Sequence, residues 1–514
     1  MTASLTSPDD WGPFGRPLFD DKTVRALSRV GVVDVGSNSV RMVIFDGAAR
    51  SPAYFYNEKI LCGLGAGLPE TGHLNPEGKR RALAALKRFQ AIARGLKIKP
   101  LTVVATAAMR EARDGPEFTR EIEQETGLKL WVIDGLEEAR LSAQGVLLGW
   151  PEADGLVCDI GGSSMELAIV RDGEVGKRIS SALGPLKLQN IPGGRKGLKS
   201  HIAGILDELA DEMGTGHKRI YLVGGSWRVI ARLDMERRNY PLHVLHEYRM
   251  SPKDISQTVK WIGDQDLQDM RHRTGTSAAR MALVPAACEV LRQLTRRFKP
   301  RDVAVSSYGI REGMLYEQMP DELRRRDPLI EACRFAEHRD ARTPGTGTAL
   351  YNFLKPLFAS APSAETRLFK AACLLHDVSW RAHPDYRAEL CFDNATRANL
   401  GGLTHPERIF LGLTLMHRYK NKHDDSRFAP LFELLDDGAM RRAETLGKAL
   451  RFGAMFSATD PDKHASLRWF PKKKKLELVL RKEAVPLFGE VAEARFNALV
   501  KSLAVTASVR ISRN

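Results

Sequence analysis

The chain has 514 residues, with 78 Lys and Arg against 63 Asp and Glu, and a net charge of +15. This length predicts two to four domains with ample core. Since no run of about 18 uncharged apolar residues occurs, we expect no transmembrane helix. The excess of positive charge favours an anionic partner, whether nucleic acid, anionic lipid or a polyanionic small substrate, unless it serves only to keep the surface solvated.

The cysteines and the first residues of the chain indicate in which cellular compartment the protein is found. The 6 cysteines are scattered without a CxxC pair, which is typical of a reducing compartment. Residues 1–21 are acidic, contain Pro and Gly, and lack the pattern of a signal peptide. We therefore expect a cytoplasmic protein whose residues 1–27 form a poorly ordered extension.

The first predicted element is a buried strand that ends beside a turn of small residues. The β-branched run at 31–35 contains Asp34, and a second strand follows to Phe45. The turn between them consists of Gly36, Ser37, Asn38 and Ser39. Backbone N–H groups and hydroxyls in such a turn can face an anion, and Asp34 beside it suits hydrated Mg²⁺.

A helix and another buried strand come next. Asn75-Pro76 marks the start of a helix that runs to about Gly95. The strand at 101–105 then ends at Thr106 and opens into a helix, whose free N–H groups would face an anion. Arg110, one turn into that helix, either reaches the same anion or is a solvated helix residue.

Two adjacent carboxylates begin the helix predicted from residue 135, after a strand at 130–133. Glu137 and Glu138 complement the positive end of the helix dipole in the ordinary interpretation. In the alternative interpretation, one of them is a general base directed at a water molecule.

Residues 156–170 repeat the pattern of the first strand pair. A strand ends at Asp159, a turn of small residues follows, and aligning Asp34 with Asp159 places Arg41 opposite Glu166. The turn consists of Gly161, Gly162, Ser163 and Ser164. Each copy places an aspartate at the end of a buried strand, so we favour a duplicated α/β fold with two phosphate-facing hairpins over two ordinary hairpins.

Two further strands end in small residues and lead into helices, at 221–228 and 303–313. Several such strand ends are what a phosphate cleft at the carboxyl edge of a sheet requires. After Tyr316 the pattern changes to a charged linker over 319–328 and then to a mostly helical segment. The four lysines at 472–475 precede an apolar run that predicts a late strand pair.

Taken together, these motifs resemble the exopolyphosphatase / guanosine pentaphosphate phosphatase family, and most closely its bacterial exopolyphosphatases. They occur in that family's order between Gly31 and Tyr316. The segments that carry the resemblance are residues 34–41, 106–112, 137–140, 159–166, 224–226 and 308–313.

The resemblance implies a fold, an activity and a cofactor. The fold would be two duplicated actin-like (ribonuclease H-like) ATPase-superfamily domains around a cleft, with a mostly helical HD-like C-terminal domain. We expect an N-terminal extension at 1–27, actin-like domains at 28–145 and 146–318, and the C-terminal domain at 319–514. The implied activity is release of terminal phosphate from inorganic polyphosphate with Mg²⁺ or Mn²⁺, usually by a cytoplasmic homodimer, with neither a membrane nor an obligate nucleic acid as partner.

The resemblance also assigns residues. Glu138 is implied to orient or deprotonate the attacking water, and Arg110 to neutralise the terminal phosphate. The metal would lie near Asp34, Asp159 and Glu166. Phosphate contacts fall on Gly36, Ser37, Asn38, Ser39, Arg41, Thr106, Gly161, Gly162, Ser163 and Ser164. Two departures from the family pattern are Ser163, where a third glycine is common, and Ala107, where a serine is common.

A long polyanion also needs a basic path beyond the cleft. The candidates are Lys187, Arg195, Lys196, Arg271, Arg273, Arg296, Arg297 and the lysines at 472–475. In the C-terminal region, His376-Asp377 looks like an HD-type metal motif, with His338, His405, His417 and Asp393 as the available further ligands. We favour a structural role for that motif over a second metal site.

Other functions remain open at this point. One is hydrolysis of the 5′ phosphate of guanosine pentaphosphate (pppGpp). Others are an ATP-dependent sugar kinase or actin-like ATPase, and a binding protein for polyphosphate or nucleic acid whose catalytic site has decayed. The Glu137-Glu138-Ala139-Arg140 segment and the complete set of acidic residues favour the phosphatase.

Overall fold

The computed structural model describes residues 29–46, 50–98, 101–189, 191–319, 321–420 and 426–512. The expected extension at 1–27 lies outside the described residues. The chain divides into two compact units, Met1–Arg326 and Asp327–Asn514.

The first half of the N-terminal unit is built on a mixed sheet in the order β3-β2-β1-β4-β5. β1 pairs antiparallel with β2 and parallel with β4. The strands are β1 (Val30–Val35), β2 (Ser39–Phe45), β3 (Tyr54–Leu61), β4 (Leu101–Ala105) and β5 (Leu130–Val132). The helices are α1 (Leu68–Thr71), α2 (Pro76–Gly95), α3 (Ala107–Glu111) and α4 (Gly115–Thr126). The predicted start of α2 is confirmed, since the Asn75 side chain accepts a hydrogen bond from Gly78 N at 2.9 Å.

The second half repeats this topology in a sheet ordered β10-β11-β9-β6-β7-β8. β6 pairs antiparallel with β7 and parallel with β9, as β1 does with β2 and β4. The strands are β6 (Gly155–Ile160), β7 (Met165–Arg171), β8 (Glu174–Ser181), β9 (Arg219–Val223), β10 (Arg249–Met250) and β11 (Asp302–Val305). The expected duplication of an α/β domain is therefore present in the strand order itself.

Helices surround this second sheet and connect it to the first. They are α5 (Gly135–Gly149), α6 (Pro185–Leu188), α7 (Gly194–Met213), α8 (Gly225–Arg237), α9 (Pro252–Gly263), α10 (Leu267–Thr274), α11 (Ala278–Met281), α12 (Val284–Phe298), α13 (Ile310–Glu317) and α14 (Asp321–Arg324). The expected boundary between residues 145 and 146 falls within α5.

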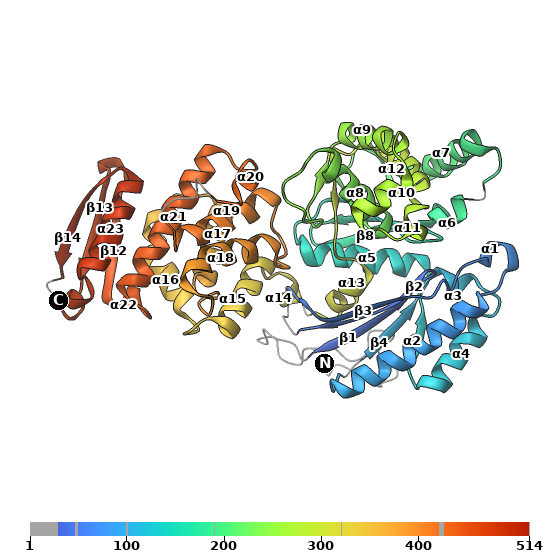
Figure 1. Cartoon of the computed structure of the whole chain (residues 1–514), viewed down its shortest axis with the longest axis horizontal. Helices are drawn as coiled ribbons and strands as arrows, with labels where there is room; N and C mark the ends of the chain where they lie inside the picture. Colours follow the sequence, from blue (N-terminus) through green and yellow to red (C-terminus); the bar gives the residue numbers. More distant parts are fainter. Residues whose placement is uncertain are drawn as a thin grey trace, which may run out of the picture. The chain divides into compact units, whose positions relative to one another are not determined.

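Helices α5 and α13 lie between the two sheets (Figure 1). One hydrophobic cluster runs from the first sheet through these helices to the second and includes Val32, Leu141, Val157 and Met314. Separate clusters fill the outer side of each half. The strand ends that carry the two Asp-containing turns are thus fixed to one shared core.

The C-terminal unit is mostly helical, as expected, and ends in a sheet ordered β12-β13-β14. Its helices are α15 (Pro328–Asp340), α16 (Thr346–Leu354), α17 (Ser363–Leu375), α18 (Arg387–Arg397), α19 (His405–His417), α20 (Ala429–Phe432), α21 (Asp437–Phe456), α22 (Pro461–His464) and α23 (Glu490–Leu503). Its strands are β12 (Ala465–Phe470), β13 (Lys475–Leu480) and β14 (Thr506–Ile511). The lysine run lies at the turn between the first two of these strands, so the predicted late strand pair is present.

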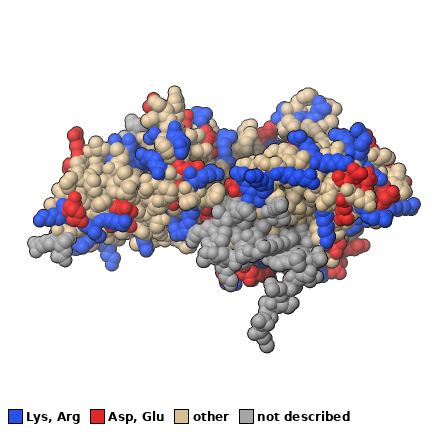
Figure 2. Space-filling view, turned by 90° about the horizontal axis from the view of Figure 1, so that it is seen from below, with Lys and Arg blue, Asp and Glu red and all other residues tan. Residues whose placement is uncertain are grey.

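The surface carries charges of both signs. Figure 2 shows Lys and Arg spread over the face seen there, with Asp and Glu among them. Within the described part of the chain, none of the helices combines the length and the apolar character needed to cross a bilayer.

Candidate active site

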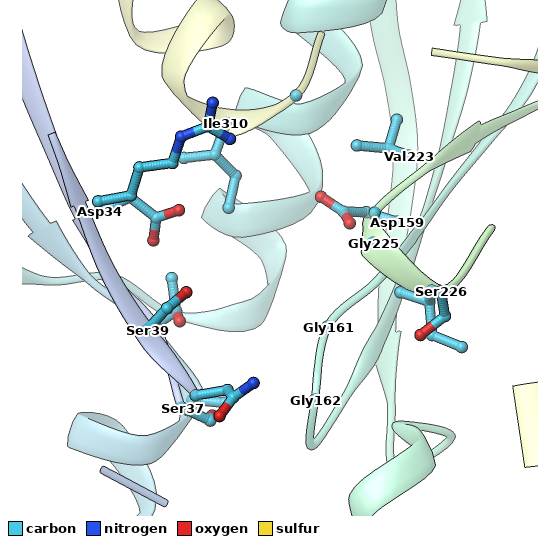
Figure 3. Close-up of a pocket in the computed structure, with 18 of the residues that line it drawn as sticks. Asp34, Ser37, Ser39, Asp159, Gly161, Gly162, Val223, Gly225, Ser226 and Ile310 are labelled. Atoms are coloured by element: carbon cyan, nitrogen blue, oxygen red, sulfur yellow. The ribbon is translucent and has the colours of Figure 1, made fainter. Parts of the chain in front are cut away.

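A cavity of about 610 Å³ lies between the two Asp-containing turns of the N-terminal unit. Asp34 and Asp159 line it from opposite walls, with their carboxylates directed toward the space between them (Figure 3). Most of the residues predicted from sequence also line it: Gly36, Ser37, Asn38, Ser39, Arg41, Thr106, Glu138, Gly161, Gly162, Ser163 and Ser164. The chain therefore brings its two distant copies of the motif to one place.

The two turns are closed by the same hydrogen bond. Gly36 N donates to Ser39 O at 3.0 Å, and Gly161 N donates to Ser164 O at 3.0 Å. The registers also match, because Asp34 lies opposite Arg41 and Asp159 opposite Glu166. The turns meet where the Ser37 and Ser163 hydroxyl oxygens lie 3.3 Å apart. An added Cβ at Gly162 would lie 2.9 Å from the Leu186 side chain, so a larger residue at this position of the turn would displace Leu186.

Each of the two aspartates has one neutralising or hydrogen-bonding partner. Arg311 Nη1 donates to Asp34 Oδ2 at 3.1 Å. The Ser142 hydroxyl donates to Asp159 Oδ2. Burial raises the pKa of both carboxyls above the usual value, because the loss of water outweighs these partners. The loss of water therefore makes both carboxyls easier to protonate, although positively charged groups lie nearby.

Glu138 lies in the first turn of α5 and is buried. The Asp134 side chain accepts a hydrogen bond from Glu137 N at 2.7 Å and so caps this helix. Glu138 Oε2 has no hydrogen-bond partner. Arg110 Nη1 lies 3.5 Å from that oxygen but donates its hydrogen bond to Ile133 O at 2.7 Å. Burial, followed by the charges of Glu166 and Asp159, raises the pKa of Glu138 well above its usual value.

Glu166 is placed differently from the other predicted acids. It is 1% exposed, it does not line the cavity, and the Ser180 hydroxyl donates to its Oε1 at 2.9 Å. Its Oε2 has no hydrogen-bond partner. Burial and the neighbouring Asp159 raise the pKa of Glu166 to about 8. Glu166 therefore lies outside the cavity lining and influences the acids of the cavity through its charge alone.

Sequence reasoning gave no role to most of the cations that line the cavity. Besides Arg41, the described lining contains Lys59, Arg228, Arg232, Arg280 and Arg311. Lys59 lies opposite Arg41 in the sheet, so β2 and β3 present two cations side by side. Burial and the neighbouring Arg280, Arg41 and Arg311 lower the pKa of Lys59 to about 8. A pair of cations at matched positions of adjacent strands is the signal that could have identified Lys59, and Arg311 lies within a motif quoted above.

The acids fit a hard divalent cation that is shared with a phosphorylated substrate. Among the described residues, no three or more His, Cys, Asp or Glu side chains form a ready-made metal cluster. Asp34 and Asp159 instead face each other across the cavity, and Glu138 contributes a buried oxygen that has no hydrogen-bond partner. Mg²⁺ is usually bound through one or two carboxylates, together with substrate phosphates and water, so this donor set suits it.

Two residues of the predicted polyanion path are paired with acids. Lys187 forms an ion pair with Glu111 at 2.9 Å, and Arg273 with Glu236 at 2.9 Å. Arg195 is an exposed residue of α7, and Arg271 is a partly buried residue of α10. None of the four lines the central cavity as described.

The HD-like pair in the C-terminal unit is engaged by protein groups. Arg342 donates to both oxygens of Asp377, and His376 Nδ1 lies 2.7 Å from Cys373 O. Asp393 pairs with Arg397 and Arg427. An acid that already pairs with arginine has less need of a metal ion, which agrees with a structural role.

Comparisons with known proteins extend these observations. A family model described as the Ppx/GppA phosphatase family matches residues 43–322, and one described as exopolyphosphatase, C-terminal, matches residues 340–509. Exopolyphosphatase 1 of Mycobacterium tuberculosis strain H37Rv is 24% identical over 311 residues, which cover 57% of this chain and 89% of that protein.

Solved structures are similar over the same region. The crystal structure of an exopolyphosphatase from Cytophaga hutchinsonii has 25% identity and a TM-score of 0.52, covering 56% of this chain and 97% of that chain. The Aquifex aeolicus member of the Ppx/GppA family has 23% identity and a TM-score of 0.50, with the same coverages of 56% and 97%.

Proposed function

The chain belongs to the Ppx/GppA phosphatase family, and we propose that it is an exopolyphosphatase that releases terminal orthophosphate from inorganic polyphosphate. One observation carries the proposal: a single cavity combines twin Gly/Ser turns, a lining rich in Lys and Arg, and a buried glutamate with an oxygen that accepts no hydrogen bond. Cations and turn N–H groups bind phosphates, and a buried carboxylate can accept a proton.

Glu138 is the general base in this mechanism. Its Oε2 accepts a proton from water while the water oxygen forms a new bond to the terminal phosphorus. The bridging P–O bond then breaks, and the chain shortened by one phosphate leaves as the anion. Such a reaction needs positioning and charge neutralisation more than covalent chemistry.

The other residues prepare this step. Arg110, whose Nη1 lies 3.5 Å from Glu138 Oε2, lowers the pKa of that carboxyl and favours its charged form. Arg110 does not line the cavity as described, so its predicted charge on the terminal phosphate would act from behind Glu138. The two turns orient the terminal phosphate, and Arg41, Lys59 and Arg311 neutralise it. Asp34 and Asp159, with Glu166 behind them, would hold Mg²⁺ or Mn²⁺, which supplies positive charge to the phosphates when bound.

The proposal also covers the compartment, the fold of the two halves, the role of the C-terminal unit and the oligomeric state. Free, buried cysteines support a reducing compartment, the cytoplasm. We also propose that the two halves are actin-like, supported by their shared strand order. The HD-like motif of the C-terminal unit would be structural, supported by the Arg342–Asp377 pair. A homodimer is proposed from the resemblance alone, and light scattering on the purified protein tests it.

The decisive experiment measures phosphate release from long-chain polyphosphate with and without Mg²⁺, beside pppGpp and ATP. We expect Mg²⁺-dependent release that is fastest with polyphosphate. Faster release from pppGpp would favour the 5′-phosphohydrolase. Transfer of the ATP γ-phosphate to an acceptor would favour a kinase, and binding of polyphosphate without release would contradict an enzyme.

A further inference from the structure

A tyrosine at the start of one strand is hydrogen-bonded to an acid behind the wall of the central cavity. Tyr54 is the first residue of β3, and its hydroxyl donates a hydrogen bond to Glu312 Oε1 at 2.5 Å. Glu312 belongs to α13, is fully buried and does not line the cavity as described. The bond joins residues that are 258 positions apart in the chain, and the mechanism proposed above uses neither of them.

Glu312 also holds a stretch of the cavity wall. Gly309 N donates a hydrogen bond to Glu312 Oε2 at 2.8 Å. Residues 309–311 all line the cavity, and the stretch ends at Arg311. Since one carboxylate oxygen of Glu312 accepts from Tyr54 and the other from Gly309, the acid connects the tyrosine to the segment that carries Arg311.

The ring of Tyr54 faces a second cation of the cavity. The Arg41 guanidinium carbon lies 5.9 Å from the centre of the Tyr54 ring, and Arg41 lines the cavity. Phe45, which is completely buried, lies opposite Tyr54 in the sheet, with its ring centre 5.8 Å away. A tyrosine whose ring packs against the core has little freedom to move, so its hydroxyl is a fixed point from which Glu312 is held.

Glu312 acts on three arginines that line the cavity. Burial, and then the charge of Arg311, lower the pKa of Arg41 and of Arg228, and the charge of Glu312 opposes both shifts. For Arg311 itself, Glu312 is the strongest charge acting against burial, and the pKa is raised. Like charges at short range repel one another, so an acid fixed by hydrogen bonds offsets this repulsion and helps to hold the cations in place. Burial, and then the charge of Glu312, raise the pKa of Tyr54, so its hydroxyl keeps its proton and remains a donor.

A second tyrosine of the same unit makes the same kind of bond away from the cavity. The Tyr248 hydroxyl donates to Asp234 Oδ2 at 2.6 Å, and both side chains are buried. Neither residue lines the central cavity as described. Loss of this hydroxyl would lower stability without reaching the cations that bind phosphate. The Tyr248–Asp234 pair therefore separates a structural role from a functional one.

We infer that Tyr54 is a positioning residue of the phosphate site: through Glu312 it fixes the 309–311 segment, and so it places the Arg311 guanidinium where the terminal phosphate binds. This inference rests on the proposed function and adds a residue outside the cavity to it. Tyr54 does not line the cavity as described, so it acts on the substrate only through the groups that it holds.

Tyr54→Phe removes the hydroxyl and keeps the ring beside Arg41. KM for polyphosphate should increase by about three- to tenfold, the size of a weakened hydrogen bond to a charged group. The value of kcat should change by less than about twofold, because Glu138 stays in place. Tyr248→Phe is the matched control: it should lower the melting temperature by a similar amount and leave KM unchanged. Equal effects of the two variants on KM would overturn the inference.

A double mutant tests whether Tyr54 acts through Arg311. In an Arg311→Gln background the cation is absent, so Tyr54→Phe should raise KM by less than about twofold. If Tyr54→Phe raises KM as much in this background as in the wild-type protein, the inference is wrong.

Glu312→Asp is a second variant that does not depend on the stability of Tyr54→Phe. It keeps the negative charge, but its side chain is one methylene shorter and cannot reach both Tyr54 and Gly309. KM should therefore increase by about the same three- to tenfold. An unchanged KM in folded Glu312→Asp would contradict the inference, since the charge alone would then be sufficient.

Binding measured without turnover separates failure of the inference from failure of the proposed function. Calorimetry with tripolyphosphate in the absence of metal gives a Kd, which should increase by about three- to tenfold in Tyr54→Phe and stay unchanged in Tyr248→Phe. If the wild-type protein binds tripolyphosphate but releases no phosphate from polyphosphate, the proposed function fails, whereas this difference in Kd still supports the positioning role. An equal Kd in wild type and Tyr54→Phe would overturn that role.

Discussion

At the scale of single residues, the site places several acids close together, and loss of water raises the pKa of Asp34, Glu138, Asp159 and Glu166. Glu138 is 6% exposed, and the neighbouring Glu166, Asp159 and Asp34 all raise its pKa, while Arg110 lowers it. In the free protein near neutral pH, a proton therefore tends to remain on this group of carboxyls. Cations that enter with the substrate favour the charged form of Glu138. Substrate binding therefore deprotonates Glu138 and makes it able to act as a base.

Glu138→Gln should therefore separate activity from stability. Turnover on polyphosphate should fall by at least about 10²-fold, because the amide accepts no proton. Removing one of several repelling acids should leave the metal-free protein as stable as before, or more so. Initial rates of phosphate release and a thermal melt at pH 8 measure the two effects. A rate near that of wild type in a folded variant would remove Glu138 from the mechanism.

Loss of the Lys59 charge should raise KM for polyphosphate at alkaline pH. Its pKa of about 8 means that the free protein loses this charge as pH rises above 8. KM for polyphosphate should accordingly increase between about pH 8 and 9.5. Lys59→Arg keeps the charge over this range, so its KM should stay flat. Identical profiles of wild type and variant would show that Lys59 does not bind substrate.

At the scale of elements, the site depends on how closely α5 packs against α13. An added Cβ at Gly313 would lie 1.8 Å from Leu141 O, and one at Gly145 would lie 2.2 Å from Gly309 O. Helix α5 carries Glu138 and α13 carries Arg311, the partner of Asp34. This contact therefore sets the distance between the base and the acid of the opposite wall.

Gly313→Ala should destabilise the N-terminal unit by about 1–3 kcal/mol, since backbone must move to accept the methyl group. Activity should fall further than stability alone explains, because Glu138 and Arg311 shift with their helices. Gly204→Ala in α7 is the control: nothing lies within 4 Å of its added Cβ, and it should stabilise by up to about 1 kcal/mol. Denaturant titrations compare the two. Equal effects would mean that the contact between α5 and α13 tolerates added volume.

The sequence allowed the twin turns to be placed, because each motif is local and the second repeats the first. It also predicted α2, a duplicated α/β fold and the late strand pair. It gave no role to Lys59, Arg228, Arg232 or Arg280, which come from β3, α8 and the segment around α11. Arg228, Arg232 and Arg280 follow no local pattern in the sequence, and only the packing of their elements brings them to one cavity.

At the scale of the whole chain, the net charge of +15 is matched by a group of Lys and Arg side chains that line the central cavity. Basic side chains are spread over the face seen in Figure 2, so the total charge alone identifies no site. The distinguishing feature is position, because Lys59 and Arg228 line the central cavity, where loss of water lowers the pKa of both side chains. The long-range field attracts a polyanion, and the cations of the cavity bind its end.

Metal binding and protonation should compete at the N-terminal unit. Glu166 has a pKa of about 8 in the folded protein, against 4.5 ordinarily, so between these values the folded state binds more protons than the unfolded state. The stability of the metal-free protein should therefore fall as pH rises through this window. Mg²⁺ held by Asp34 and Asp159 would add positive charge near Glu166 in place of the lost proton, and so it should raise the melting temperature more at pH 8 than at pH 6.

Thermal melts with and without Mg²⁺ at the two pH values measure this competition. Glu166→Gln should reduce the difference between pH 6 and pH 8, since the amide neither titrates nor repels its neighbours. Asp377→Asn in the C-terminal unit is the matched control: it breaks the pair with Arg342 and should lower stability by about 1–3 kcal/mol while leaving the pH-dependent response to Mg²⁺ intact. An equal shift at both pH values would place the metal away from these acids, and loss of the response in Asp377→Asn would assign it to the HD-like motif instead.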